Sequence, residues 1–260
     1  MNKKKLKIGL ITYRGNPSSG GQGIYINYLS RALSDLGHEV TVISGPPYPE
    51  IRKDIKLVKI PSLDLFSKKN KFLDVKFSKL FSLNNLKEWI SANSGGFPEP
   101  HTFGPRLEKF IEENAGQFDV IHDNQTLCKE LISLQQKLPL VTTIHHPITK
   151  DLEFQLKSTN DFFLKLLIKR WHSFIPTQIK VAKKLKKIVV PSESSGKDVV
   201  KDFSLKDESI EVVHNGIDLG FFYPSDKPYE EYNILYIASS DVPKKGLDFM
   251  IKAIPEIKKH

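Results

Sequence analysis

Short apolar runs alternate with segments of helical periodicity along most of the chain, and this alternation constrains the fold more than any other feature. The first two runs are Leu6–Thr12 and Val40–Ile43. Between them, apolar residues from Ile24 to Leu36 recur at helical spacing, and Gly37 follows where a helix-ending glycine belongs. A strand–helix–strand unit of this length implies two parallel strands. The sequence therefore predicts an α/β fold with a doubly wound parallel sheet.

The same alternation continues to about residue 214. Further strands are expected at 57–60, 118–122, 140–144, 187–190 and 210–214, and further helices around 107–111, 127–138, 160–186 and 192–203. Ser192 is expected to cap the last of these helices. Residues 61–102, rich in Phe, Lys, Ser, Gly and Pro, predict an insertion with short helices.

A polar stretch that contains Pro224 and Pro228 predicts a linker at 218–231 between two domains, 1–217 and 232–260. The second domain is expected to start with a strand at 233–238 and a helix at about 246–257. About 30 residues cannot close a core of their own. We therefore expect a truncated chain, which by itself would be inactive as an enzyme.

Composition narrows the cellular setting. No apolar run approaches the roughly 20 residues of a membrane span. The single cysteine, Cys128, fits a reducing compartment, so a cytoplasmic location is expected.

The formal net charge of +9 is concentrated in residues 162–192, which contain no Asp or Glu. Lysines alternate there with large apolar residues that include Trp171 and Phe174. Two interpretations stay open: a core helix with a solvated lysine face, or peripheral contact with an anionic membrane surface. Nucleic-acid binding is not expected, because no recognition motif accompanies the charge.

Glycine-rich residues, Gly20, Gly21, Gln22 and Gly23, form a predicted loop between the first strand and its helix. Ligands of open α/β sheets bind beyond the carboxyl ends of strands. Helix N-termini there offer unpaired N–H groups to anions. The loop is therefore a candidate phosphate or sugar site, and a plain tight turn is the alternative.

Polar residues end two predicted strands at the same edge. His122, Asp123 and Asn124 follow one strand, and His145 and His146 follow the next. Histidine is suited to sharing a proton near neutral pH. Histidines satisfied by neighbouring backbone groups are the alternative at both places.

Two further candidates come later in the chain. Asn215 and Gly216 form a turn after the last predicted strand, and Lys245 and Gly246 precede the final predicted helix. A lysine at that helix start can hold a diphosphate, although an ordinary solvated lysine is the alternative. The histidines lack metal-ligand spacing and no Asp-x-Asp occurs, so no metal cofactor is expected.

These segments, read in order, resemble the glycosyltransferases of family 4. The resemblance rests on Gly20–Gly23, on Leu36-Gly37-His38-Glu39-Val40, on Phe118–His122, on Val190-Pro191-Ser192, on Val212–Asp218 and on Lys245-Gly246-Leu247. Each motif is weak alone, but the ordered series covers essentially the whole chain. The segments 44–49, 122–125 and 143–148 resemble one bacterial subgroup of this family.

The resemblance implies two Rossmann-like domains facing a cleft, the GT-B fold, with the acceptor on the first domain and a nucleotide-diphosphate sugar on the second. It implies transfer with retention of configuration, without a metal, to a glycan, lipid-linked or small-molecule acceptor. His145 matches the histidine that contacts the donor sugar, the Gly20–Gly23 segment the loop that closes over donor phosphate and acceptor, and Lys245 the lysine that neutralises the leaving diphosphate.

The sequence departs from the family pattern at two places. Ser239–Asp241 stand where an arginine usually assists the lysine, and the family's Glu-x7-Glu segment is absent from these 260 residues. Two other readings therefore stay open: a non-catalytic acceptor-binding remnant, and another enzyme of two Rossmann-like domains such as a sugar-nucleotide epimerase.

Overall fold

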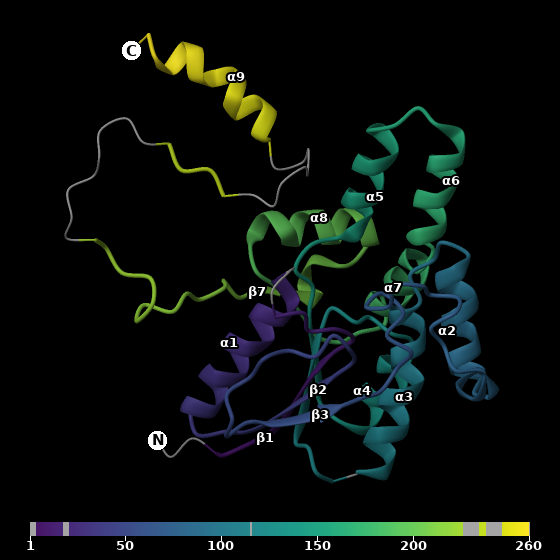
Figure 1. Cartoon of the computed structure of the whole chain (residues 1–260). Helices are drawn as coiled ribbons and strands as arrows, with labels where there is room; N and C mark the ends of the chain where they lie inside the picture. The colour runs from purple at the N-terminus through teal and green to yellow at the C-terminus, as the bar shows by residue number, and fades with distance from the viewer. Residues whose placement is uncertain (1–3, 18–20, 115, 226–233, 238–245, 260) are drawn as a thin grey trace. The chain divides into compact units, whose positions relative to one another are not determined.

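A seven-stranded sheet forms the centre of the compact unit Met1–Gly216, and every pairing in it is parallel (Figure 1). The structure is a computed structural model that describes residues 4–17, 21–114, 116–225, 234–237 and 246–259. The strand order is β3-β2-β1-β4-β5-β6-β7, so the order reverses between β1 and β4. The strands are β1 (Lys7–Thr12), β2 (Glu39–Ser44), β3 (Lys56–Lys59), β4 (Val120–Asn124), β5 (Leu140–Thr143), β6 (Ile188–Val190) and β7 (Ile210–Val212).

Helices connect these strands and cover both faces of the sheet. They are α1 (Gly21–Asp35), α2 (Leu83–Asn93), α3 (Glu99–Glu113), α4 (Leu131–Lys137), α5 (Ile148–Lys157), α6 (Phe162–Trp171), α7 (Ile175–Ala182) and α8 (Glu193–Phe203), with short 3₁₀ turns η1 (Phe77–Phe81) and η2 (Asp207–Ser209). A further helix, α9 (Leu247–Ile257), follows the last strand in the chain. The α/β doubly wound fold predicted from the alternation is confirmed.

Neighbouring residues of one strand enter different cores, because side chains alternate across a sheet. Leu10 of β1 belongs to the apolar cluster that includes Ile26 of α1. Ile11, the next residue, belongs to the cluster that includes Leu107 of α3. Figure 1 shows α1 on one side of the sheet and α3 on the other. Two-sided burial of this kind explains why five of the six residues are buried in β1 and likewise in β2.

Two helices end or begin at the residues that the sequence indicated, a glycine after α1 and a serine before α8. Gly37 has φ of 90° after α1, and the N–H of His38 donates to the carbonyl of Leu33 at 3.1 Å. The hydroxyl of Ser192 accepts the N–H of Ser195 at 3.1 Å and caps α8.

Three sequence predictions need correction. The expected loop ends before Gly21, because α1 already begins there. Helix α3 begins at Glu99, inside the expected insertion, and α5 is an additional helix that the sequence pattern did not indicate. Both helices begin beside a proline, at N1/N2 of α3 and at the N-cap of α5, and proline is compatible with a first helical turn.

By internal contacts the chain divides into two compact units, Met1–Gly216 and Ile217–His260. The described part of the second unit contains α9, as predicted, but residues 234–237 form no strand there. The strand expected at 233–238 is therefore wrong for these four residues. A parallel strand needs a hydrogen-bonded neighbour, and the described residues of this unit contain none. The linker and the domain start at 232 stay predictions.

None of the helices in the described ranges combines the length and the apolar character that crossing a bilayer requires.

Candidate functional site

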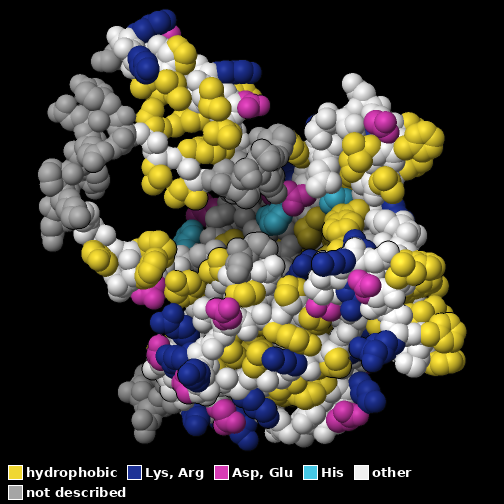
Figure 2. Space-filling model, in the orientation of Figure 1, with side chains coloured by type: hydrophobic (Ala, Val, Ile, Leu, Met, Phe, Trp, Pro, Cys, Tyr) yellow, Lys and Arg dark blue, Asp and Glu magenta, His cyan; other side chains and the backbone are white. Residues whose placement is uncertain are grey.

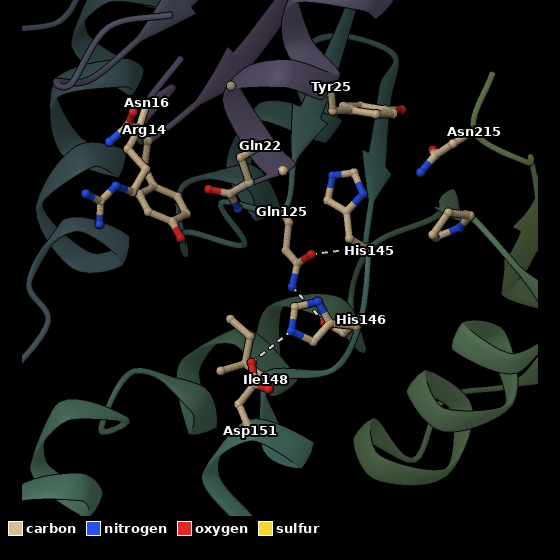
Figure 3. Close-up of a pocket in the computed structure, with 14 residues that line it drawn as sticks. Arg14, Asn16, Gln22, Tyr25, Gln125, His145, His146, Ile148, Asp151 and Asn215 are labelled. Atoms are coloured by element: carbon tan, nitrogen blue, oxygen red, sulfur yellow. Dashed lines mark hydrogen bonds and ion pairs between the residues drawn. The ribbon is translucent and has the colours of Figure 1, made fainter. Parts of the chain in front are cut away.

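A pocket of about 630 Å³ opens at the carboxyl edge of the sheet, where the strand order reverses (Figure 3). Its walls come from the residues that follow five strands, from the first two turns of α1 and from the start of α5. The lining residues are Tyr13, Arg14, Asn16, Gly21, Gln22, Gly23, Tyr25, Gln125, His145, His146, Ile148, Asp151, Pro191 and Asn215. This is the place where open α/β sheets bind their ligands.

The glycine segment enters the pocket as the first turn of α1. Gly21, Gln22 and Gly23 all line the pocket, and their helix N-terminus supplies a partial positive charge there. Gly23 also packs tightly: a Cβ at this position would lie 2.2 Å from the carbonyl oxygen of Asn16. Only glycine therefore allows α1 to start this close to the loop after β1.

His145 is held from two sides. Its Nε2 lies 2.6 Å from Oδ1 of Asn124, and its ring packs edge-on against Tyr25 with the centroids 4.6 Å apart. The amide oxygen of Asn124 can only accept a hydrogen bond, so Nε2 of His145 is the donor. In the neutral imidazole the other nitrogen, Nδ1, is then an acceptor.

Burial keeps this imidazole neutral. Desolvation, assisted by the charge of neighbouring His146, lowers the pKa of His145 from 6.5 to about 4. At neutral pH the side chain is therefore an uncharged acceptor at the pocket wall, and it is not a ready source of protons.

Gln125 fixes the backbone that carries both pocket histidines. Its Oε1 accepts the N–H of His145 at 2.7 Å, and its Nε2 donates to the carbonyl of His146 at 2.8 Å (Figure 3). The residue has φ of 51°, a left-handed conformation that is uncommon for a side chain of this size. Strained backbone of this kind concentrates at binding and catalytic sites.

His146 points toward α5, across the pocket. Its Nε2 lies 2.9 Å from Oδ2 of Asp151, and about half of the His146 side chain is exposed. Because both residues line the pocket, this pair adds a carboxylate to the wall formed by the start of α5.

His122, Asp123 and Asn124 lie behind the pocket and do not line it. His122 contacts the Thr143 hydroxyl at 2.7 Å, and burial together with His145 lowers its pKa to about 4. Asp123 is fully buried, where its Oδ1 accepts the hydroxyl and the N–H of Thr126. Burial raises the pKa of Asp123 to about 6. These residues therefore do not face a ligand in the pocket, and two of them hold neighbours in place: Asn124 contacts His145, and His122 contacts Thr143.

The remaining candidates are distributed between the two units. Asn215 lines the pocket, whereas exposed Gly216 does not. Gly246 has φ of 77° and precedes α9 in the second unit. Gly20 and Lys245 lie outside the described residues.

Several pocket residues were not among the sequence candidates. They are Tyr13, Arg14, Asn16, Tyr25, Gln125, Ile148, Asp151 and Pro191. All but Tyr25, Ile148 and Asp151 lie within a few residues after the end of a strand. Their position after a predicted strand was therefore the one signal in the sequence that could have identified them. Within the described ranges, no three His, Cys, Asp or Glu side chains gather in a way that would hold a metal ion.

Comparison with known proteins assigns the chain to a family. The model for Glycosyltransferase Family 4 matches residues 19–221. A curated relative named MMP alpha-(1->4)-mannosyltransferase, from Mycolicibacterium hassiacum, is 37% identical over 97% of this chain and 62% of its own length. Another, Phosphatidyl-myo-inositol mannosyltransferase from Mycolicibacterium smegmatis, is 24% identical over 97% of this chain and 55% of its own. The chain thus spans about three fifths of the curated relatives it matches.

Among solved structures, the catalytic domain of starch synthase IV from Arabidopsis thaliana, bound to ADP and acarbose, matches with a TM-score of 0.53. The match covers 98% of this chain and 67% of that one at 14% identity, which supports the fold. With the family model matching most of its length, this chain belongs to glycosyltransferase family 4.

Proposed function

We propose that this chain provides the acceptor-side domain of a retaining glycosyltransferase, in which His145 contacts the sugar that is transferred. The observation that carries the proposal is the hydrogen bond from His145 Nε2 to Asn124, which leaves Nδ1 as an acceptor for a sugar hydroxyl. A neutral histidine suits this role, because a charged imidazole would have no acceptor to offer.

The N-terminus of α1 is proposed to face the donor diphosphate. Its first turn lines the same pocket as His145, and unpaired helix N–H groups stabilise negative charge that develops on a leaving group. In the transfer, the bond between the sugar C1 and the diphosphate oxygen breaks, and a bond to the acceptor oxygen forms on the same face. The acceptor proton passes to the departing diphosphate. The proposal assigns the neutralising charge to α1 and Lys245 and invokes no metal cofactor.

The names of the relatives suggest the sugar. Both curated relatives are named mannosyltransferases, and one of them is 37% identical to this chain. We therefore propose a nucleoside-diphosphate mannose as the donor and a hydroxyl of a glycan, lipid-linked or small-molecule acceptor as the nucleophile.

Transfer assays with the protein at its natural length test this proposal. GDP-mannose, UDP-glucose and UDP-galactose are offered with mannose-containing oligosaccharides and with inositol-lipid acceptors, and products are identified by mass spectrometry and NMR. Transfer of mannose with an α-linkage from the α-configured donor is expected. Inverted product, or transfer from none of the donors, contradicts it. Saturable acceptor binding without transfer would favour the non-catalytic remnant.

Peripheral contact with an anionic membrane, through residues 162–192, is proposed as a second property. The structure divides this segment into two helices of different character. In α7, Ile175, Val181 and Ala182 are buried. In α6 no residue is buried, and Phe162 and Phe163 are 67% and 76% exposed. The core interpretation therefore fits α7 but is wrong for α6.

The exposed apolar side chains of α6 lie beside cations. Figure 2 shows hydrophobic side chains over α5 and α6, and the last turn of α6 carries Lys169 and Arg170. Apolar residues that enter the headgroup region, with basic residues next to them, characterise helices that lie on anionic bilayers. The exposed face of α6 supports reversible binding to a membrane surface, and we propose that the protein does so from the cytoplasm.

A further inference from the structure

A second pocket of about 570 Å³ lies beside the edge strand β3, and it shares no lining residue with the first. It is bordered by the end of β3, by η1, by the start of α2 and by α3. Four cationic side chains line it: Lys59, Lys79, Arg106 and Lys109. Nothing in the proposed transfer reaction uses this pocket.

Arg106 is the rigid member of this basic group. Its Nη2 donates to Oε2 of Glu88 at 2.6 Å and to Oδ1 of Asn85 at 2.7 Å. Glu88 is only 2% exposed and also accepts the N–H of Leu63 at 3.0 Å. Both partners use the same terminal nitrogen. The guanidinium is therefore fixed in place while no described residue accepts a hydrogen bond from its Nε or Nη1.

The three lysines are much less neutralised. The ammonium of Lys59 lies over the ring of Tyr48 at 5.1 Å. Lys109 is 3.7 Å from Glu113, an exposed pair of little strength. Within the described residues, no carboxylate lies within ion-pair distance of Lys59 or Lys79. Four cations thus face only Glu113 and the buried Glu88, which leaves an excess of two positive charges.

The size and walls of the pocket indicate what kind of anion it takes. Val58, Ile60 and Phe110 contribute apolar surface next to the cations. A volume in the range of small-molecule sites exceeds the need of a single oxyanion. An anion that carries an organic group fits both the cationic and the apolar side of the pocket. Its charge contacts the lysines while its organic group packs on the apolar residues. A doubly charged phosphate also matches the excess charge.

We propose that this pocket binds the phosphate group of an organic phosphate, with Arg106 and the lysines as its ligands. The phosphate belongs either to a soluble phosphorylated compound or to a lipid headgroup. This site is independent of the proposed sugar transfer, so failure of one leaves the other standing.

Calorimetric titration of the chain with glycerol 3-phosphate, and with glycerol as the uncharged control, tests the site. The pocket variant is Lys59→Ala/Lys79→Ala. Its matched control is Lys56→Ala/Lys197→Ala, which removes the same charge from exposed lysines outside the pocket. Arg106 is left intact, since removing it would leave Glu88 buried without a partner. We expect saturable binding of glycerol 3-phosphate that is about tenfold weaker in the pocket variant and unchanged in the control.

Vesicles of phosphatidylglycerol and phosphatidylcholine identify the source of the phosphate. With a lipid headgroup as ligand, vesicle binding falls in the pocket variant alone and glycerol 3-phosphate competes with it. With a soluble ligand, both variants bind vesicles equally, while only the pocket variant loses glycerol 3-phosphate. Absence of saturable binding in both arms, or an equal loss in both variants, overturns the proposal.

Discussion

Oδ1 of Asn124 accepts a hydrogen bond from Nε2 of His145 at 2.6 Å, and this contact decides which nitrogen of the imidazole can meet a ligand. The amide Nδ2 of the same asparagine lies 3.3 Å from the carbonyl oxygen of Gln22. One fully buried side chain therefore connects the histidine after β5 with the first turn of α1. Asn124 therefore couples the positions of two pocket segments that the sequence indicated, the histidine after β5 and the glycine segment at the start of α1.

His145→Ala should lower turnover far more than acceptor affinity. The variant loses the hydrogen-bond acceptor that the proposed reaction assigns to the transferred sugar, so kcat and kcat/KM should fall together by about 100-fold, with little change in the acceptor KM. Steady-state kinetics on the protein at its natural length measure this. His101→Ala, at an exposed position on α3, is the matched control. An unchanged kcat in His145→Ala contradicts a role in transfer.

The imidazole of His145 should stay neutral, with its proton on Nε2, at pH 7. Because burial lowers its pKa from 6.5 to about 4, the unfolded chain binds this proton at a higher pH than the folded chain does. His145 therefore destabilises the fold progressively as the pH falls from about 6.5 to 4, and contributes no such loss above that window. Nitrogen-15 NMR of the histidine rings reports both the tautomer and the midpoint. A midpoint near 6.5, or a proton on Nδ1, would refute the assignment.

Gly23→Ala should destabilise the chain, whereas Gly21→Ala should not. The added methyl at position 23 would lie 2.2 Å from the carbonyl oxygen of Asn16, which forces α1 and the loop apart. At Gly21 the same methyl meets nothing within 4 Å, and alanine is the better helix former. We expect a loss of about 1–3 kcal/mol in the free energy of unfolding for Gly23→Ala. Urea unfolding of both variants measures it, and equal stabilities would show that the loop yields without cost.

Gln125→Ala should loosen the backbone at His145 and His146. Without the side chain, the N–H of His145 and the carbonyl of His146 lose their partner, at a cost of about 1–3 kcal/mol. Gln155→Ala, on the exposed surface of α5, is the control. Urea unfolding gives the free energies, and amide hydrogen exchange at His145 should accelerate in the Gln125 variant alone. Unchanged exchange at His145 argues against the bridging role.

Phe163→Ser should weaken binding to anionic vesicles. The side chain is 76% exposed on α6, so its removal costs little stability, but it removes apolar surface that would enter the headgroup region. We expect roughly tenfold weaker partitioning in vesicle flotation, and a further loss at high salt for every variant. Leu36→Ser, at an exposed leucine after α1, should leave binding unchanged. Equal binding of wild type to neutral and anionic vesicles would remove the electrostatic part of the proposal.

Periodicity predicted the sheet and most of its helices because each element carries its own signal. The run Leu6–Thr12 and the spacing from Ile24 to Leu36 indicate a strand and a helix before any tertiary contact is known. The same reasoning was wrong at residues 234–237, where an apolar run has no paired strand among the described residues. It also did not distinguish α6 from α7, because exposed and buried apolar helices have similar spacing, and only packing separates them.

The sequence alone therefore determined most of the alternation of strands and helices, the parallel pairing and the edge of the sheet at which polar residues gather. Each of these follows from local periodicity and from the handedness of strand–helix–strand units. Tertiary structure decided the rest. Asn124 reaches His145 because the pairing of β4 with β5 places their carboxyl ends side by side, although the two residues are 21 positions apart in the chain. The tautomer and lowered pKa of His145, the need for glycine at position 23 and the basic pocket at Arg106 all depend on groups that are distant in sequence. No local pattern can encode such contacts.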